Sequence, residues 1–193
     1  MRIIAGEFRG RKILPPASDA TRPITDRVKQ SVFDILTPLL DGATVFDCFA
    51  GTGSMGLECL SRGAKKVLFF ESDRSALKLL DKNIEALKLR DRADIIPGDL
   101  FKWFESPTKS QDSTIPADII FLDPPYSFLK DRPRDLQQLI TNLRNGLLQS
   151  TATIVFRHDA NDALDLPGTL RTDQRIYGGM AVEFLRVSGY SHP

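Results

Sequence analysis

The chain has 193 residues, of which 41% are hydrophobic and 26% are charged, and its formal net charge is +1. This composition is ordinary for a folded globular domain and excludes a disordered or collagen-like chain. No stretch approaches the roughly 20 consecutive apolar residues that a membrane helix needs, and the opening MRIIAGEFRGRK lacks the apolar centre of a secretory signal. We therefore expect a cytoplasmic protein that does not bind membranes.

The first forty residues predict short strands followed by a helix. Residues 1–15 alternate around Gly6 and Gly10, a pattern that favours a β-hairpin or two short strands. The segment PPASDATRP at 15–23 interrupts regular structure. Thr25 is a suitable N-cap, and the apolar residues that follow it at helical spacing predict an amphipathic helix over residues 26–40.

Positive charge is concentrated in the N-terminal segment. Residues 1–30 contain seven Lys or Arg against three Asp or Glu, a net charge of +4, so the rest of the chain sums to −3. A basic segment on a slightly acidic body is a candidate phosphate-binding surface. The same pattern also fits a solvated edge rich in Lys and Arg, and charge alone does not choose between the two interpretations.

Strand and helix patterns alternate through the middle of the chain. Short apolar runs predict strands at 43–49, 66–71, 93–99, 117–123 and 151–158, with helices at 51–63, 75–89, 100–105 and 136–147. The tail at 169–187 instead predicts two antiparallel strands joined at Gly178-Gly179, at the sheet edge. The predicted fold class is α/β: a Rossmann-like, mostly parallel seven-stranded sheet with a small N-terminal extension.

Acidic residues follow four of the predicted strands, where open α/β sheets bind their ligands. The first is Asp47, which opens the string DCFAGTGSMG. Its glycines allow a sharp turn from strand to helix and a close approach of a ligand to the backbone. The string also fits the dinucleotide fingerprint G-x-G-x-x-G, which is weak evidence alone, and a glycine-rich turn without a ligand stays open.

Two further acids suit a nucleoside. Glu71 stands twenty residues after Gly51 and can accept hydrogen bonds from ribose hydroxyls. Asp99 follows the third strand and can accept from an adenine amino group. Either acid could instead serve a helix N-terminus. Ser72 or Asp73 could take that role in place of Glu71, and Asp99 precedes the predicted helix at 100–105.

The fourth acid belongs to Asp123-Pro124-Pro125-Tyr126, directly after the fourth strand. The two prolines fix the backbone and remove two N–H donors. The Pro124 carbonyl and the Asp123 carboxylate then form a paired acceptor for an amino group. Tyr126 offers an aromatic face on which a base can stack. A rigid turn with a buried tyrosine is the structural alternative.

These motifs together resemble the amino-methyltransferases, through Phe49-Ala50-Gly51-Thr52-Gly53 and the DPPY box. More narrowly, the chain resembles the RsmD family of bacterial 16S rRNA guanine-N2 methyltransferases over essentially its whole length. The strings that support this narrower resemblance are RIIAG at 2–6, RGRK at 9–12, RP at 22–23, TDRVK at 25–29 and LSRGA at 60–64.

The resemblance implies S-adenosylmethionine as the cofactor. Gly51 and Gly53 would face its methionine part, Asp47 its ammonium, Glu71 its ribose and Asp99 its adenine. The remaining residues that the resemblance implies for this pocket are Phe49, Ala50, Ser72 and Leu100.

The resemblance also implies the substrate and its contacts. Asp123, Pro124, Pro125 and Tyr126 would hold the exocyclic amino group of a guanosine that has left its stack. The partner would be small-subunit rRNA, in an assembled or assembling ribosomal particle. Apart from the resemblance, nothing in the sequence pattern demands a partner chain, so we expect a monomer, with a dimer left open. Residues 1–24 would form an RNA-contacting extension on a methyltransferase domain at 25–193, with Arg9, Arg11, Lys12 and Arg27 gripping phosphates.

Other functions fit parts of the sequence. An NAD-dependent oxidoreductase could use the glycine turn and Glu71, but would not need the DPPY box. An adenine-N6 methyltransferase of DNA or RNA shares that box, although DNA enzymes usually have a separate recognition region. A non-catalytic RNA-binding factor would not need the intact acids. Two cysteines and two histidines show no metal-ligand spacing, so we expect no metal and free thiols at Cys48 and Cys59.

Overall fold

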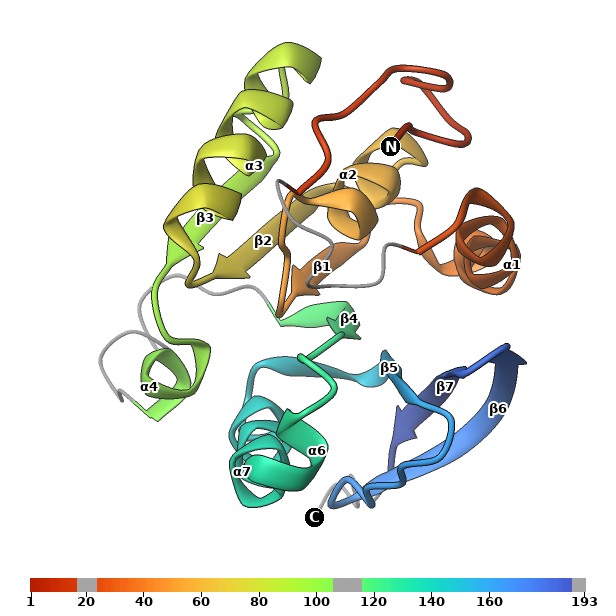
Figure 1. The fold of residues 1–193 in the computed structure, drawn as a ribbon, viewed down its shortest axis with the longest axis vertical. Coiled ribbons are helices and arrows are strands. Elements are labelled where there is room, and N and C mark those ends of the chain that lie inside the picture. Colours follow the sequence, from red (N-terminus) through yellow and green to blue (C-terminus); the bar gives the residue numbers. More distant parts are fainter. Residues whose placement is uncertain (17–23, 106–115, 189–193) are drawn as a thin grey trace. The chain divides into compact units, whose positions relative to one another are not determined.

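A computed structural model describes residues 1–16, 24–105 and 116–188 of the chain. Seven strands form one sheet in the order β3-β2-β1-β4-β5-β7-β6, which confirms the predicted Rossmann-like class (Figure 1). The chain divides into two compact units, Met1–Asp99 and Leu100–Pro193. Residues 17–23, most of the segment at 15–23 that is predicted to interrupt regular structure, lie outside the described residues.

The first unit is built on three parallel strands, β1 (Thr44–Asp47), β2 (Lys66–Glu71) and β3 (Ala93–Pro97). Asp47 pairs with Phe69, and Glu71 pairs with Pro97, so the strands end at a common edge. Helix α2 (Ser54–Ser61) packs on β1 and β2, and α3 (Arg74–Leu87) packs on β3. Strand β1 is buried at every position, as expected for a central parallel strand.

Helix α1 (Asp26–Leu36) is shorter than predicted. Thr25 is its N-cap, as expected, and accepts a hydrogen bond from the Val28 N–H at 3.4 Å. The helix ends at Leu36 and continues only as the 3₁₀ turn η1 (Thr37–Leu39). Pro38 has no N–H to extend the α-helical pattern, and the Thr37 hydroxyl donates to the Phe33 carbonyl at 2.6 Å. The predicted range 26–40 is therefore a helix plus a tighter turn.

The N-terminal arms pair less regularly than a hairpin of two strands. One antiparallel bridge joins Arg2 to Lys12, and the Ile3 N–H donates to the Arg11 carbonyl at 3.0 Å. Several other backbone groups of the segment bind side chains of α2 and α3: the N–H groups of Ile4 and Ala5 donate to Glu58, and that of Leu14 donates to Asn83. Gly6 adopts φ +82°, and a Cβ there would lie 1.8 Å from the Ser61 carbonyl oxygen. The segment therefore follows the surface of two helices, and glycine is required where it comes closest.

The described part of the second unit, residues 100–105 and 116–188, contains the remaining strands of the sheet and three helices. Its helices are α4 (Leu100–Glu105), α6 (Phe128–Asp131) and α7 (Pro133–Arg144). Its strands are β4 (Ala117–Leu122), β5 (Leu148–Asp159), β6 (Thr169–Tyr177) and β7 (Met180–Val187). Strand β4 is parallel to β5, whereas β7 is antiparallel to both β5 and β6. The predicted C-terminal hairpin is confirmed, and the short helix α6 was not predicted.

Candidate active site

The glycine turn after β1 has an open backbone. Gly51 and Gly53 adopt φ +55° and +86°, in the region that favours glycine. A Cβ at Gly51 would meet no atom within 4 Å, so the backbone there is accessible to a ligand. A Cβ at Gly53 would instead lie 2.5 Å from Leu80 Cδ1. Gly53 is therefore required for close packing of the turn against α3, whatever it contacts in a ligand.

Glu71 organises this turn. One of its carboxylate oxygens accepts a hydrogen bond from the Gly51 N–H at 2.7 Å. The other accepts from Ser72 at 2.8 Å and Asp73 at 2.7 Å. Helix α3 is capped by Asp73, which accepts from the Ala76 N–H at 2.8 Å, so Glu71 is not its cap. Three donors fill three of about four acceptor positions of a carboxylate, so Glu71 retains capacity for one further donor.

Asp47 is buried, with 2% of its surface exposed. Its carboxylate accepts a hydrogen bond from the Gly56 N–H at 3.0 Å, in the first turn of α2. A negative charge at a helix N-terminus is favourable. Gly56 cannot be larger, because a Cβ there would lie 2.3 Å from the Phe69 ring. Asp47 therefore fixes the helix that follows the turn, in addition to the ligand contact predicted for it.

The other residues predicted for the cofactor differ in exposure. Asp99 and Ser72 are exposed, Phe49 is half-buried, and Ala50 and Leu100 are buried. The Gly98 N–H donates to the Glu71 carbonyl at 2.8 Å. This hydrogen bond holds the residue before Asp99 at the end of β2. Leu100 is 5% exposed, so its side chain belongs to the core.

The DPPY box contains an ion pair that the sequence analysis missed. Arg157 of β5 donates through Nε to Asp123 Oδ1 at 2.6 Å. The side chains of Arg157 and Asp123 are 14% and 24% exposed. The register of β4 on β5 pairs Leu122 with Phe156, which puts the next residues of both strands side by side. An arginine inside the apolar run TATIVFRH was the available signal, since a buried charge needs a partner.

The environment of Asp123 disfavours its charge. Burial raises the pKa of this carboxyl above its ordinary value of 3.8, and the Arg157 guanidinium opposes that shift only in part. Protonation turns one carboxyl oxygen into a donor and removes the negative charge, so the neutral form is a weaker acceptor for an amino group. Any activity that uses Asp123 as an acceptor should therefore fall as the pH drops through this raised pKa.

Arg157→Leu is expected to move the acid limb of the kcat/KM profile to higher pH by about 1–3 units, because the opposing positive charge is removed. The measurement is kcat/KM for methyl transfer between pH 5 and pH 9. Arg175→Leu is the control, since Arg175 is exposed on β6 and pairs with Asp173. An acid limb that stays in place in Arg157→Leu would show that Arg157 does not govern the ionisation of Asp123.

The rest of the box forms a compact turn. Pro124 is buried, Pro125 is exposed and Tyr126 is half-buried. The Pro125 carbonyl accepts from the Phe128 N–H at 2.8 Å, at the start of α6. The tyrosine hydroxyl is buried, so any stacking surface on Tyr126 is limited to part of its ring.

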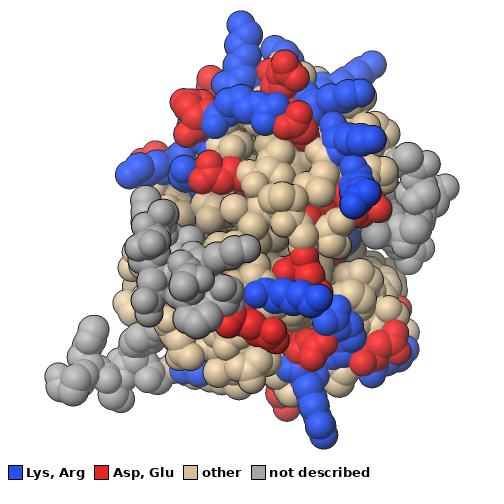
Figure 2. Space-filling model, turned by 90° about the vertical axis from the view of Figure 1, so that its left-hand side faces the viewer, with Lys and Arg blue, Asp and Glu red and all other residues tan. Residues whose placement is uncertain are grey.

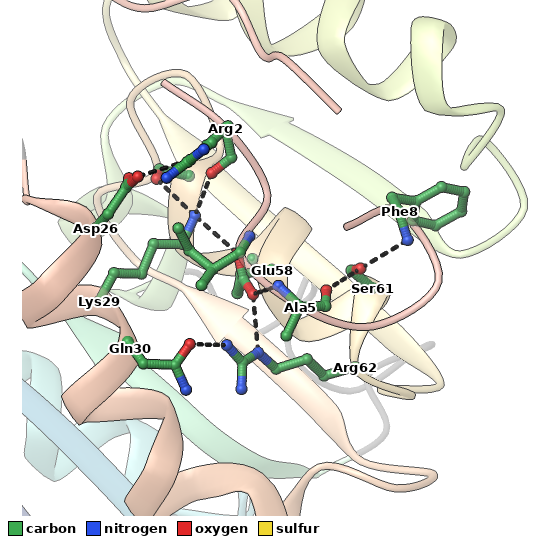
Figure 3. Close-up of polar contacts among 12 residues, drawn as sticks. Arg2, Ala5, Phe8, Asp26, Lys29, Gln30, Glu58, Ser61 and Arg62 are labelled. Carbon is green, nitrogen blue, oxygen red and sulfur yellow. Dashed lines mark hydrogen bonds and ion pairs between the residues drawn. The ribbon is translucent and has the colours of Figure 1, made fainter. Parts of the chain in front are cut away.

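A buried ionic cluster holds the N-terminal segment against α1 and α2 (Figure 3). Glu58 of α2 is fully buried and pairs with Lys29 at 3.0 Å and Arg62 at 2.8 Å. It also accepts from the N–H groups of Ile4 at 2.8 Å and Ala5 at 2.9 Å. Lys29, counted above within the basic segment, is only 1% exposed and so adds no charge to the surface.

The same cluster reaches the glycine turn. Lys29 Nζ lies 3.3 Å from both the Arg2 carbonyl oxygen and Ser54 Oγ. Ser54 is the first residue of α2, directly after Gly53. One buried ammonium group therefore touches the N-terminal segment and the helix that the glycine turn begins.

The predicted phosphate contacts lie on the surface. Arg9, Arg11, Lys12 and Arg27 are all exposed. Arg11 donates to the Ala86 carbonyl at 3.0 Å, in the last turn of α3. No ion pair among the described residues involves Arg9, Lys12 or Arg27. Their charges are available to a phosphate backbone.

Residues 1–16, 24–105 and 116–188 contain neither a helix suited to a membrane nor a group of side chains suited to a metal ion. No helix there has the length and apolar character to cross a membrane. No three His, Cys, Asp or Glu residues gather where they could hold a metal ion. Cys48 and Cys59 are buried free cysteines, as predicted, and burial raises the pKa of both thiols.

The sheet order, the glycine turn after β1 and the acids after the parallel strands define a class I methyltransferase. A solved structure with this fold, titled "Putative methyltransferase yhhF from Escherichia coli", is 29% identical, with a TM-score of 0.79 over 98% of each chain. The family model described as "Conserved hypothetical protein 95" matches residues 1–186, and the chain belongs to that family.

Named relatives agree with this assignment. "Putative rRNA methyltransferase YlbH" of Bacillus subtilis is 32% identical over 194 residues, which cover 98% of this chain and 100% of that protein. "Ribosomal RNA small subunit methyltransferase D" of Escherichia coli K12 is 36% identical over 165 residues, which cover 85% of this chain and 77% of that protein. The predicted resemblance to the RsmD family is thereby confirmed.

Proposed function

We propose that this methyltransferase transfers the methyl group of S-adenosylmethionine to the exocyclic N2 of a guanosine in small-subunit rRNA. The observation on which this depends is Asp123 in the DPPY box, held by Arg157 at 2.6 Å, in a chain whose relatives are named rRNA methyltransferases. We further propose that the protein is a cytoplasmic monomer, that it acts on a ribosomal particle and that it needs no metal ion.

The residues after β1 and β2 fit the cofactor. Gly51 offers an open backbone, and Glu71 retains one acceptor position for a ribose hydroxyl. Asp47, Phe49, Ala50 and Gly53 would complete the methionine side, with Ser72, Asp99 and Leu100 on the adenine side. When bound, S-adenosylmethionine supplies a methyl group activated by a positive sulfur.

The residues after β4 fit the amino group. The guanine N2 would donate its two hydrogens to the Asp123 carboxylate and the Pro124 carbonyl, with the base against Pro125 and Tyr126. Its lone pair would form the new N–C bond as the S–CH₃ bond breaks, leaving a neutral thioether. The nitrogen becomes positive and then loses one proton. A carboxylate beside it stabilises that charge, and fixed orientation lowers the entropic barrier.

The N-terminal segment supplies a basic surface for the RNA. We propose an RNA-contacting extension at residues 1–24 on a methyltransferase domain at 25–193. Phosphates would be contacted by Arg9, Arg11, Lys12 and Arg27. These contacts would position the substrate without reading its sequence. The segment also provides Ile3 and Ile13 to the core. Point substitutions of the exposed charges therefore test this role better than a deletion would.

The test is methyl transfer by the purified protein to small-subunit rRNA and to small-subunit particles, followed by mass mapping of the product. We expect one N2-methylguanosine. S-adenosylmethionine at 100 times its Kd should raise the free energy of unfolding by about 2.7 kcal/mol, and NAD should not. A methyl group on adenine N6 would contradict the guanine assignment, and stabilisation by NAD alone would favour an oxidoreductase.

A further inference from the structure

Helix α3 presents an exposed row of cations that leads from the N-terminal segment to the glycine turn. We propose that this row, formed by Arg74, Lys78, Lys82 and the guanidinium of Arg11, binds consecutive phosphates of the substrate RNA strand. The proposal rests on the proposed function and adds a surface that the sequence analysis did not identify.

The row follows from helix geometry. Arg74, Lys78 and Lys82 are spaced four residues apart, so they share one side of the helix. Each step rises about 6 Å along the axis, close to the separation of consecutive phosphates in a nucleic-acid strand. The buried positions of the helix are Leu80, Asn83, Ile84 and Leu87. The row lies on the opposite, solvent side, where all three side chains are exposed.

Arg11 extends the row by one turn. The next position after Lys82 in the same series is Ala86, and the Arg11 guanidinium donates to the Ala86 carbonyl at 3.0 Å. This contact also suits the negative end of the helix. It uses one of the five N–H donors of the guanidinium, so the others can bind a phosphate. The N-terminal segment and α3 therefore form one continuous basic surface.

Two acids lie on the helix near the row, Asp81 and the exposed Glu85, which is three residues after Lys82. Asp81 lies on the helix beside Lys78 but pairs with Arg90. No ion pair among the described residues involves Arg74, Lys78 or Lys82. Figure 2 faces the side on which α3 and β3 lie in Figure 1, and Lys and Arg gather toward its upper end with Asp and Glu among them.

The end of the helix gives a second, independent indication. Lys88 follows α3 with φ +58°, the only described non-glycine residue with positive φ. Glycine is favoured at this position, because a side chain there costs about 1 kcal/mol. Strained residues that persist often serve a function. A lysine in place of glycine adds one more exposed positive charge at the end of α3.

The row begins where the proposed cofactor lies. Arg74 is the first residue of α3, and its cap Asp73 donates its N–H to Glu71. Glu71 in turn holds Gly51. A strand bound along the row would thus run from the N-terminal segment toward the nucleoside pocket. A polyanion with regular spacing fits such a row better than an acidic protein surface, on which charges are irregular.

The experiment compares Lys78→Gln/Lys82→Gln with the wild type in binding to protein-free small-subunit rRNA over a range of salt concentrations. Losing two phosphate contacts should weaken binding and reduce the slope of log K against log[salt] by about 1.4. The matched control is Lys65→Gln/Lys102→Gln, which removes the same charge from exposed positions outside the row. Its slope should equal that of the wild type, and S-adenosylmethionine binding should be unchanged in both variants.

The proposal that the row binds phosphates would be contradicted by an unchanged salt slope in Lys78→Gln/Lys82→Gln, or by an equal change of slope in the control. A loss of affinity for assembled particles without a loss of affinity for protein-free rRNA would indicate that the surface contacts a ribosomal protein. That result would also contradict the proposal. These results differ from failure of the proposed function, in which the wild type itself would methylate no RNA.

Discussion

Asp123→Ala should lower kcat for methyl transfer at least about a hundredfold, while the Kd for S-adenosylmethionine changes little. The physical reason is that the carboxylate orients the amino group and stabilises the positive charge that develops on its nitrogen, which is commonly worth 10²–10³ in rate. The residues proposed to bind the cofactor follow β1, β2 and β3, whereas Asp123 follows β4. Single-turnover kinetics on rRNA and calorimetric titration with the cofactor measure the two quantities.

The alanine variant also removes the ion pair between Asp123 and Arg157, so its loss of activity alone does not separate an effect on chemistry from an effect on packing. Asp123→Asn keeps the shape and one acceptor oxygen but removes the negative charge. We expect Asp123→Asn to be folded, with a circular dichroism spectrum like that of the wild type, and nearly inactive. Asp173→Asn, which removes an exposed acid on β6, should retain full activity. Substantial turnover in a folded Asp123→Asn variant would remove Asp123 from the chemistry.

The sequence predicted the elements whose signals are local. Strands such as Ala117–Leu122 are continuous apolar runs, and α7 has its leucines at helical spacing, so both were found. The acids at the strand ends followed from the same pattern, because a parallel sheet fixes where its strands end. Helix α1 was overestimated, since Leu39 and Leu40 continue the apolar period although Pro38 prevents another helical turn.

Contacts between distant residues were not predictable from these patterns. Glu58 lies in the string GLECLSRG, where a charged residue on a helix would ordinarily face solvent, yet it is fully buried. Its partner Lys29 is 29 positions away and was counted as part of a basic surface. The pairing of Asp123 with Arg157 depends on the register of β4 on β5. In each case tertiary packing decides which charges are exposed, and spacing along the chain does not contain that information.

Glu58→Gln should be the most destabilising of the substitutions considered, by about 3–5 kcal/mol. The variant leaves the Lys29 ammonium buried without a full negative partner, and it weakens the hydrogen bonds from Ile4 and Ala5. Burial alone would raise the pKa of Glu58, but Lys29, the Ile4 N–H and Arg62 outweigh it and keep the pKa below its ordinary value of 4.5. The ionised Glu58 therefore stabilises the fold at pH values above 4.5. This contribution is lost as the pH falls through the lowered pKa of the folded protein.

Denaturant unfolding at pH 7 measures this loss, and hydrogen exchange at Ile4 and Ala5 reports whether the N-terminal segment detaches. Asp94→Asn is the control, because it removes the half-exposed Lys66–Asp94 pair and should cost less than about 1 kcal/mol. Lys29→Met/Glu58→Gln should lose less than the sum of its single substitutions, since the second removes a charge that the first left unpaired. If Glu58→Gln cost no more than Asp94→Asn, the buried cluster would not be what holds the N-terminal segment against α1 and α2.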